Sequence, residues 1–245
     1  MGNYYEWVIE QTISKIKRSG QIPPDLDDLD LEDKKTYELI SSGDTDGIFN
    51  CQRSDEKSYF RIANLDKFSD LVSFTALNRP GPIAQDFILD FIDNKNKTNY
   101  FDFSDRRNLR RIIDYKELSL ESILHETYGL ILFREQINEI TKKVASFDEK
   151  MGATFIKNLN KRIHKVVEKD RNHFFENALN NGFSEEQIIK IYDWIKYYVG
   201  FTANKKFIKK VALITYKMAY LKAHYPNEFA VANEIDNEEI SIYRR

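Results

Sequence analysis

Cysteine, glycine and proline are all scarce in this chain of 245 residues. Its one cysteine, Cys51, has no second thiol with which to form an internal disulfide or a two-cysteine metal site. Nine glycines and five prolines are few for a fold with many tight turns, which disfavours β-sandwiches and β-barrels. No apolar run reaches the roughly 18–20 residues of a membrane helix, and the first residues lack a secretory signal pattern. These absences favour a reduced, cytoplasmic setting without membrane contact.

Motifs for metal, cofactor or hydrolytic chemistry are also missing. The four histidines lie far apart, and neither the GxxxxGK[ST] nor the GxGxxG phosphate loop occurs. The GxSxG nucleophile motif is absent as well. Paired carboxylates can hold two Mg²⁺ ions, and three Asp-x-Asp pairs are present: Asp25/Asp27, Asp28/Asp30 and Asp44/Asp46. Because these pairs lie in stretches typical of loops, we predict that they are solvated, with no metal, cofactor or catalytic residue in the chain itself.

Apolar residues follow the helical period over most of the chain. With 42% hydrophobic residues the chain can bury a core, and the pattern predicts a mainly α fold with a few short strands. We expect two helical sub-lobes, over residues 1–116 and 117–245. The predicted helices cover residues 3–18, 33–41, 64–77, 83–94, 184–199 and 204–224, with a last one from 226 onward, and short extended segments are expected at 48–49 and 130–133.

The net charge of −2 conceals a strong asymmetry along the chain. Residues 150–225 contain fifteen Lys and Arg against six Asp and Glu, a net charge of +9, so the remainder carries −11. A basic face of this kind attracts phosphates of nucleic acids, nucleotides or lipid head groups. A set of solvated helix faces explains the same composition, and the residues leave both interpretations open.

Lysines recur at intervals of four residues in this basic region. One stripe consists of Lys157, Lys161 and Lys165, flanked by Arg162 and Lys169, and Lys205/Lys209 and Lys206/Lys210 repeat the spacing. On one helix these side chains would share a face, and like charges at this spacing destabilise a free helix by a few tenths of a kcal/mol per pair. The stripes therefore favour use against an anion, although a lysine-rich overall composition is the alternative.

Several spaced segments resemble the fingers region of bacterial C-family replicative polymerases, the DNA polymerase III alpha subunits. The resemblance runs from about residue 16 to 234. It includes LEDKKTYELI and GDTDGIF, which are similar to the family's "LDDxKTYELLxxGDTxGVFQ", and ETYGLILFREQ, which is similar to "ETYGIILYQEQ". The matching segments are residues 31–40, 43–49, 68–72, 76–82, 91–95, 126–136 and 220–229. Within them, Arg79, Pro80, Gly81 and Pro82 reproduce the family's "RPGP" turn.

The resemblance implies a helical domain that closes over the template end and the incoming deoxynucleoside triphosphate. The family's "LRRAMGKK" helix and "FNKSHA" turn face the triphosphate, and without gaps they fall on residues 155–162 and 203–208. The phosphate-binding residues implied in this way are Lys157, Lys161, Arg162, Asn204 and Lys205. Lysine can bind phosphate as a point charge, although it lacks the bidentate fork of arginine.

The sequence departs from the family where the family contacts nucleotide. Ile156 replaces the first arginine of the helix motif, and Lys206 and Phe207 replace the serine and histidine of the turn motif. The turns, by contrast, are kept. This pattern suggests a retained fold with altered nucleotide handling.

The resemblance also limits the predicted function. In the family, the metal-binding aspartates belong to a palm region upstream of the fingers, so we expect this chain alone not to polymerise DNA, and Mg²⁺ to be involved only when it is joined to a palm. The favoured hypothesis is a non-catalytic module that binds DNA, nucleotide or both in replication or repair. The alternatives are a split-polymerase subunit that docks on a palm-bearing chain, and a degenerate structural remnant without a ligand.

Overall fold

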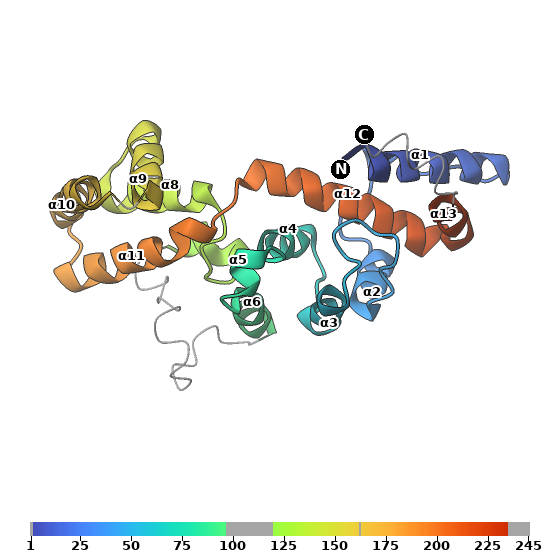
Figure 1. The fold of residues 1–245 in the computed structure, drawn as a ribbon, viewed down its shortest axis with the longest axis horizontal. Helices are drawn as coiled ribbons and strands as arrows, with labels where there is room; N and C mark the ends of the chain where they lie inside the picture. Colours follow the sequence, from blue (N-terminus) through green and yellow to red (C-terminus); the bar gives the residue numbers. More distant parts are fainter. Residues whose placement is uncertain (1, 97–119, 162, 235–245) are drawn as a thin grey trace. The chain divides into compact units, whose positions relative to one another are not determined.

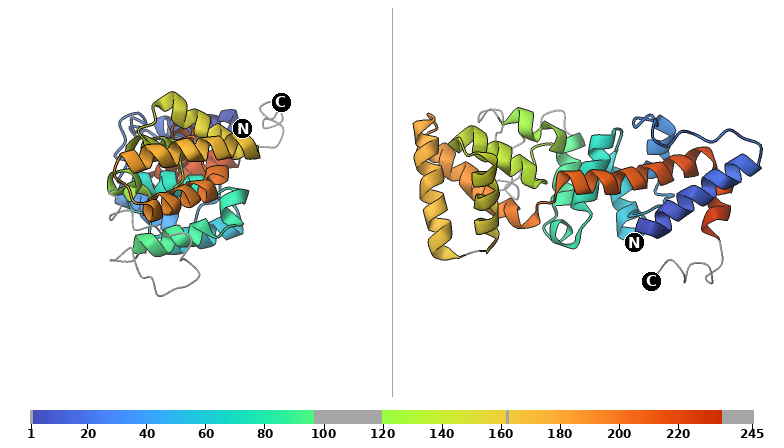
Figure 2. Two further views of the ribbon diagram at one scale, coloured as in Figure 1. Left: turned by 90° about the vertical axis from the view of Figure 1, so that its left-hand side faces the viewer. Right: turned by 90° about the horizontal axis from the view of Figure 1, so that it is seen from above.

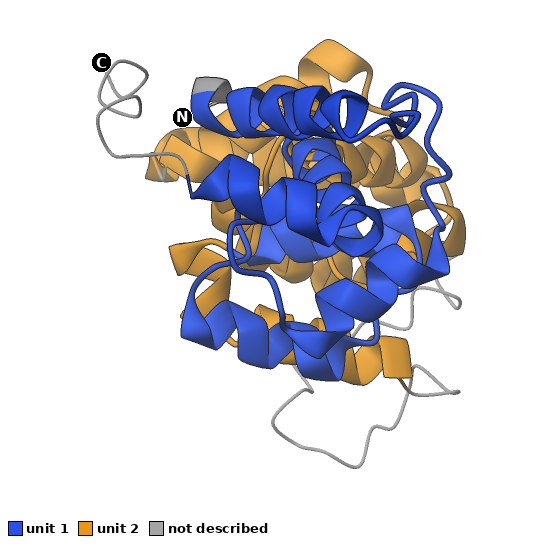
Figure 3. Ribbon diagram, turned by 90° about the vertical axis from the view of Figure 1, so that its right-hand side faces the viewer, with its two compact units in different colours: residues 1–78, 209–245 blue, residues 79–208 orange. Residues whose placement is uncertain are grey.

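The computed structural model describes residues 2–96, 120–161 and 163–234, and these form helices joined by loops of different lengths (Figure 1). The helices divide between two compact units, residues 1–78 with 209–245 and residues 79–208 (Figure 3). No helix among the described residues combines the length and apolar character needed to cross a bilayer. The two units do not have the bounds of the sub-lobes expected at 1–116 and 117–245. Residues 209–234 pack with the N-terminal helices, and the local sequence does not show contacts between such distant residues.

The first unit consists of α1 (Gly2–Arg18), α2 (Lys34–Ser42), α3 (Ser54–Ala63), α4 (Phe68–Leu77), most of α12 (Lys205–His224), and α13 (Pro226–Asn233). Helix α1 packs against α13 (Figure 2). At the centre, the fully buried ring of Tyr216 on α12 lies 5.7 Å from the ring of Tyr37 on α2, between centroids. The Tyr216 hydroxyl donates to the carbonyl oxygen of Asp30 and accepts from the Asp33 backbone N–H. This residue therefore ties the acidic loop before α2 to α12.

The second unit consists of α5 (Pro80–Ile83), α6 (Phe87–Asn96), α7 (Glu121–Leu124), η1 (His125–Thr127), α8 (Arg134–Ala145), α9 (Glu149–Lys161), α10 (His164–Asn180), α11 (Glu185–Tyr198), η2 (Val199–Phe201) and the start of α12. Helix α10 packs against α8, α9 and α11 (Figure 1). The interior between them is aromatic, since Phe147, Phe155, Phe174 and Tyr192 are each at most 3% exposed.

The mainly α fold predicted from the sequence is confirmed. Helix ends follow the expected signals, for example at Ser184, whose hydroxyl accepts from the Gln187 N–H while the Gln187 side chain accepts from the Ser184 N–H. Pro226 is the first residue of α13, as predicted. The expected extended segment at 130–133 has one counterpart, an isolated parallel bridge between Phe133 and Ala203.

Several expected local elements are wrong. Residues 48–49 lie in a turn in which the Ile48 N–H donates to Thr45, so the strand expected there does not form. The helix expected over 64–77 begins only at Phe68, because Asn64 is left-handed with a φ of 47° and ends α3, a helix that was not predicted. At the expected turn of residues 79–82, α4 has ended at Leu77 and Pro80 begins the one-turn helix α5, with Arg79 as its N-cap residue.

Candidate nucleic-acid interface

Helix α9 separates a buried apolar face from an exposed basic one. Phe155, Ile156 and Leu159 are each at most 6% exposed, whereas Lys157 and Lys161 are exposed. Neither lysine has an ion pair or hydrogen bond with a described residue. Ile156 stands where the family motif has an arginine, and its burial shows that this chain uses the position for packing. Two unpaired ammonium groups one helical turn apart can contact successive anionic groups.

The predicted single lysine stripe is divided between two helices. Helix α9 ends at Lys161 and α10 begins at His164, with Ile163 in an extended conformation between them. Lys157 and Lys161 therefore lie on α9, whereas Lys165 and Lys169 lie on α10. Arg162, which was predicted to bind phosphate, falls outside the described residues. The expectation that Lys157, Lys161 and Lys165 share one helix face is therefore wrong.

Aromatic packing explains why the chain turns at this point. The rings of Phe155 and Phe174 stack with centroids 5.5 Å apart. In one continuous helix these residues, nineteen positions apart, would be separated by about 28 Å along the axis. Asn158 on α9 also donates a hydrogen bond of 2.8 Å to the carboxylate of Asp170 on α10. These contacts between α9 and α10 hold the α9 backbone and thereby the positions of its lysines.

The segment 203–205 is fixed by polar contacts with α8 and the residues before it. The Ala203 N–H donates to the Leu132 carbonyl oxygen at 2.9 Å, and the Arg134 N–H donates to the Ala203 carbonyl oxygen at 3.0 Å. Asn204 caps the following helix, since its side-chain oxygen accepts from the Phe207 N–H at 2.8 Å.

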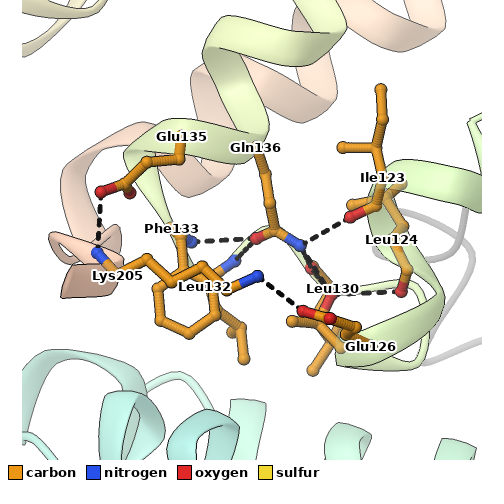
Figure 4. A network of polar contacts seen from close by, with 10 residues as sticks. Ile123, Leu124, Glu126, Leu130, Leu132, Phe133, Glu135, Gln136 and Lys205 are labelled. Carbon is orange, nitrogen blue, oxygen red and sulfur yellow. Dashed lines mark hydrogen bonds and ion pairs between the residues drawn. The ribbon is translucent and has the colours of Figure 1, made fainter. Parts of the chain in front are cut away.

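Of the predicted phosphate-binding residues that the structure describes, Lys205 is the most constrained (Figure 4). Its backbone N–H donates to the Glu135 carboxylate at 2.9 Å, and its ammonium group forms an ion pair with Glu126. The ammonium nitrogen also lies 5.7 Å from the centroid of the Phe133 ring. An approaching phosphate would therefore compete with Glu126 for this charge.

Gln136 links the same region by hydrogen bonds from a buried position. It was not predicted as a site residue, although it lies in the ETYGLILFREQ segment. It is 5% exposed, and its side-chain oxygen accepts from the backbone N–H groups of Leu132 at 2.8 Å and Phe133 at 2.9 Å. Its amide group donates to the hydroxyl of Thr127 at 2.8 Å and to the carbonyl oxygen of Ile123 at 3.2 Å (Figure 4). One buried side chain thus joins α7, η1 and the start of α8.

The turn of Arg79, Pro80, Gly81 and Pro82 packs against the end of η2. The Arg79 guanidinium donates to the carbonyl oxygen of Phe201, and its burial, followed by the charge of Arg134, lowers the pKa of Arg79 below its usual value. A β-carbon on Gly81 would approach the Phe201 ring to 3.2 Å, which favours glycine there. Helix α9 also packs against η2. The structure therefore joins the proline-rich turn, α9 and the segment that leads into Asn204 and Lys205.

Basic and acidic side chains pair differently in the first unit. Lys217 pairs with Asp27 at 2.9 Å, Lys222 with Asp44 at 2.7 Å, and Lys57 with Asp46 at 2.6 Å. Carboxylates of the Asp-x-Asp pairs thus neutralise lysines. Across residues 2–96, 120–161 and 163–234, no group of three or more His, Cys, Asp or Glu side chains is arranged to hold a metal ion.

Comparison with known proteins assigns the chain to a family. Residues 7–182 match the family described as the bacterial DNA polymerase III alpha subunit finger domain. The chain belongs to this family. The match contains α9, the proline-rich turn and Gln136, and ends before Asn204 and Lys205.

Relatives among the DNA polymerase III alpha subunits extend the finger-domain likeness over more of the chain. The subunit of Mycobacterium tuberculosis strain H37Rv is 34% identical over 222 residues, which are 91% of this chain and 18% of that protein. The subunit of Escherichia coli strain K12 is 28% identical over 236 residues, 95% of this chain and 20% of that protein. The chain therefore spans about a fifth of the length of these relatives.

Proposed function

We propose that this finger domain binds DNA, and the phosphates of an incoming nucleotide, through the basic face of α9. The observation that carries the proposal is the pair Lys157 and Lys161, which are exposed and have no partner among the described residues. The family is that of a DNA polymerase subunit, which supports a nucleic-acid ligand over other anions.

The ion pairs of other lysines strengthen this choice. Lysines of the first unit such as Lys217 and Lys222 already pair with aspartates, so an anion would have to displace a carboxylate. Lys157 and Lys161 have only water and counterions to release. Binding releases counterions that are condensed on the DNA. For duplex DNA, each phosphate contact makes the slope of log affinity against log salt concentration more negative by about 0.9.

The other residues implied by the family would support this contact in different ways. Asn204 holds the first turn of α12 through its cap, and Lys205 exchanges its ion pair with Glu126 for a phosphate when DNA or nucleotide arrives. Arg162, which follows Lys161 in the sequence, is proposed as a further phosphate contact from the resemblance to the family motif. Nucleotide addition would require metal-binding aspartates of a palm, with Mg²⁺, in a cytoplasmic replication enzyme.

The experiment compares two double variants for binding to a fluorescent primer–template DNA at about 0.1 M salt. We expect Lys157→Ala with Lys161→Ala to weaken binding by roughly tenfold or more, since one phosphate contact accounts for up to about eightfold at this salt concentration. The matched control is Lys17→Ala with Lys35→Ala, which removes the same charge from exposed lysines of the first unit.

Equal weakening in both double variants would show that net charge alone governs binding, and would contradict the proposal. Absence of binding by the unmodified chain at low salt would instead favour a structural remnant, or a chain that binds DNA only beside a palm-bearing partner.

A further inference from the structure

Phe207 is an exposed aromatic side chain in the first turn of α12. It is 62% exposed, and of the aromatic side chains whose burial the structure describes it alone is exposed. Its ring has no aromatic or cationic contact with another described residue. Single apolar side chains are often exposed on protein surfaces, so the exposure of this ring gains meaning only from the groups around it.

Lysines surround this ring along the helix. Lys206 precedes it, Lys210 lies on the next turn of the same face, and Lys209 is between them in the sequence. All three are exposed and form no ion pair with a described residue. Glu126 and Glu135 are the acidic groups recorded near this turn, and both contact Lys205. The surroundings of the ring on α12 are therefore basic, which selects against a cationic or purely apolar partner.

The backbone under Phe207 is held in place. Its N–H donates to the Asn204 side chain at 2.8 Å, and the segment before it is bonded to Leu132 and Arg134. A ring on a fixed helical turn loses little freedom when a planar ligand stacks on it. Every nucleobase offers such a planar face, and the nearby ammonium groups suit the phosphates that accompany it.

We propose that Phe207 is a stacking platform for an unpaired nucleobase of single-stranded DNA, with Lys206 and Lys210 contacting the phosphates beside that base. The inference rests on the proposed DNA-binding function and adds a specific base contact to it. It concerns a residue at which this chain departs from the family motif, which has histidine there. Stacking does not depend on base identity, so the affinity that this contact provides should vary little with the DNA sequence.

The experiment separates base from phosphate in the ligand. Binding of an oligothymidylate is compared with binding of an abasic strand of the same length and charge, for the unmodified chain, Phe207→Ala and Phe207→Trp. Leu179→Ala is the control, because Leu179 is also exposed, at 52%, and lies on α10.

We expect Phe207→Ala to weaken binding of oligothymidylate by roughly 5- to 150-fold, the range for loss of one base–aromatic stack. Its affinity for the abasic strand should stay within about twofold, as should both affinities of Leu179→Ala. Phe207→Trp should retain the preference for the strand with bases, and its added indole should be quenched by oligothymidylate but not by the abasic strand.

Three results would overturn the inference. If Phe207→Ala binds both strands as the unmodified chain does, the stack does not form, while phosphate binding and the proposed function stand. If Phe207→Ala weakens both strands equally, the ring does not recognise a base. If the unmodified chain binds neither strand, the proposed function fails and the stacking platform fails with it.

Discussion

At the scale of single residues, Gln136 matters more to the candidate interface than its chemical class suggests. Its amide satisfies two buried N–H groups and two acceptors at once, and the N–H groups, of Leu132 and Phe133, lie on the segment that bridges to Ala203. The geometry of Asn204 and Lys205 therefore depends on a residue that does not itself meet the solvent. Removal of such a buried polar side chain destabilises the fold, because each donor or acceptor that it leaves behind is shielded from water and has no partner.

Replacement of Gln136 by leucine should destabilise the chain by about 2–4 kcal/mol, because the N–H groups of Leu132 and Phe133 would remain buried without acceptors. The free energy of unfolding in urea measures this loss. Gln187→Leu is the matched control, since Gln187 acts only in the cap of α11 and should cost about 1 kcal/mol or less. Equal losses of unfolding free energy in the two variants would contradict this role, because Gln136 would then contribute no more than a side chain in a helix cap.

At the scale of elements, the carboxylate of Asp33 connects the start of α2 with the end of α12. Asp33 caps α2 through a 2.8 Å hydrogen bond from the Thr36 N–H, and its carboxylate lies 2.9 Å from His224 Nε2. Burial alone would raise the pKa of Asp33, but the hydrogen bonds from Thr36 and His224 outweigh burial and lower it below its usual value. The ionised carboxylate is therefore the form that the folded chain stabilises.

A group with a lowered pKa in the folded state stabilises the fold above its unfolded pKa, and that contribution disappears as the pH falls through the folded pKa. Asp33→Asn, which keeps a capping oxygen, should cost about 1–2 kcal/mol at pH 7. The difference from the unmodified chain should narrow as the pH falls below about 4, because the unfolded chain takes up a proton at Asp33 before the folded chain does.

Urea unfolding across this pH range checks the role of Asp33, with Asp28→Asn as a control in the neighbouring exposed loop. A cost of Asp33→Asn that is constant from pH 7 to pH 3 would contradict a role for the ionised carboxylate.

Much of the element order could be predicted from the sequence, and the reasons for the exceptions are physical. Caps such as Asp33 and Ser184 act within a few residues, so their signals are visible locally. No glycine or proline in the sequence marks the end of α9 at Lys161, and this helix end depends on the stacking of Phe155 on Phe174. The missed helix α3 and the false strand at 48–49 likewise reflect packing around Phe60 and Ile48, both at most 1% exposed.

At the scale of the whole molecule, a net charge of −2 is the sum of two different arrangements. Acidic loops neutralise lysines such as Lys217 and Lys222, whereas α9 and the first turns of α12 present lysines such as Lys157 and Lys206 without described partners. The sequence could predict the basic region, and its resemblance to a family supplied candidate residues whose binding role stays a prediction. It could not predict which lysines are paired, because pairing depends on contacts such as Lys217 with Asp27, 190 positions apart.

The most direct test of the central claim is the dependence of DNA affinity on salt, measured for the unmodified chain and for Lys157→Ala with Lys161→Ala. We predict that log affinity for a primer–template falls linearly with log salt, and that the double variant makes the slope shallower by about 1.8, as expected for two lost phosphate contacts. Slopes that are equal in the two proteins would contradict the account, because Lys157 and Lys161 would then contact no phosphate.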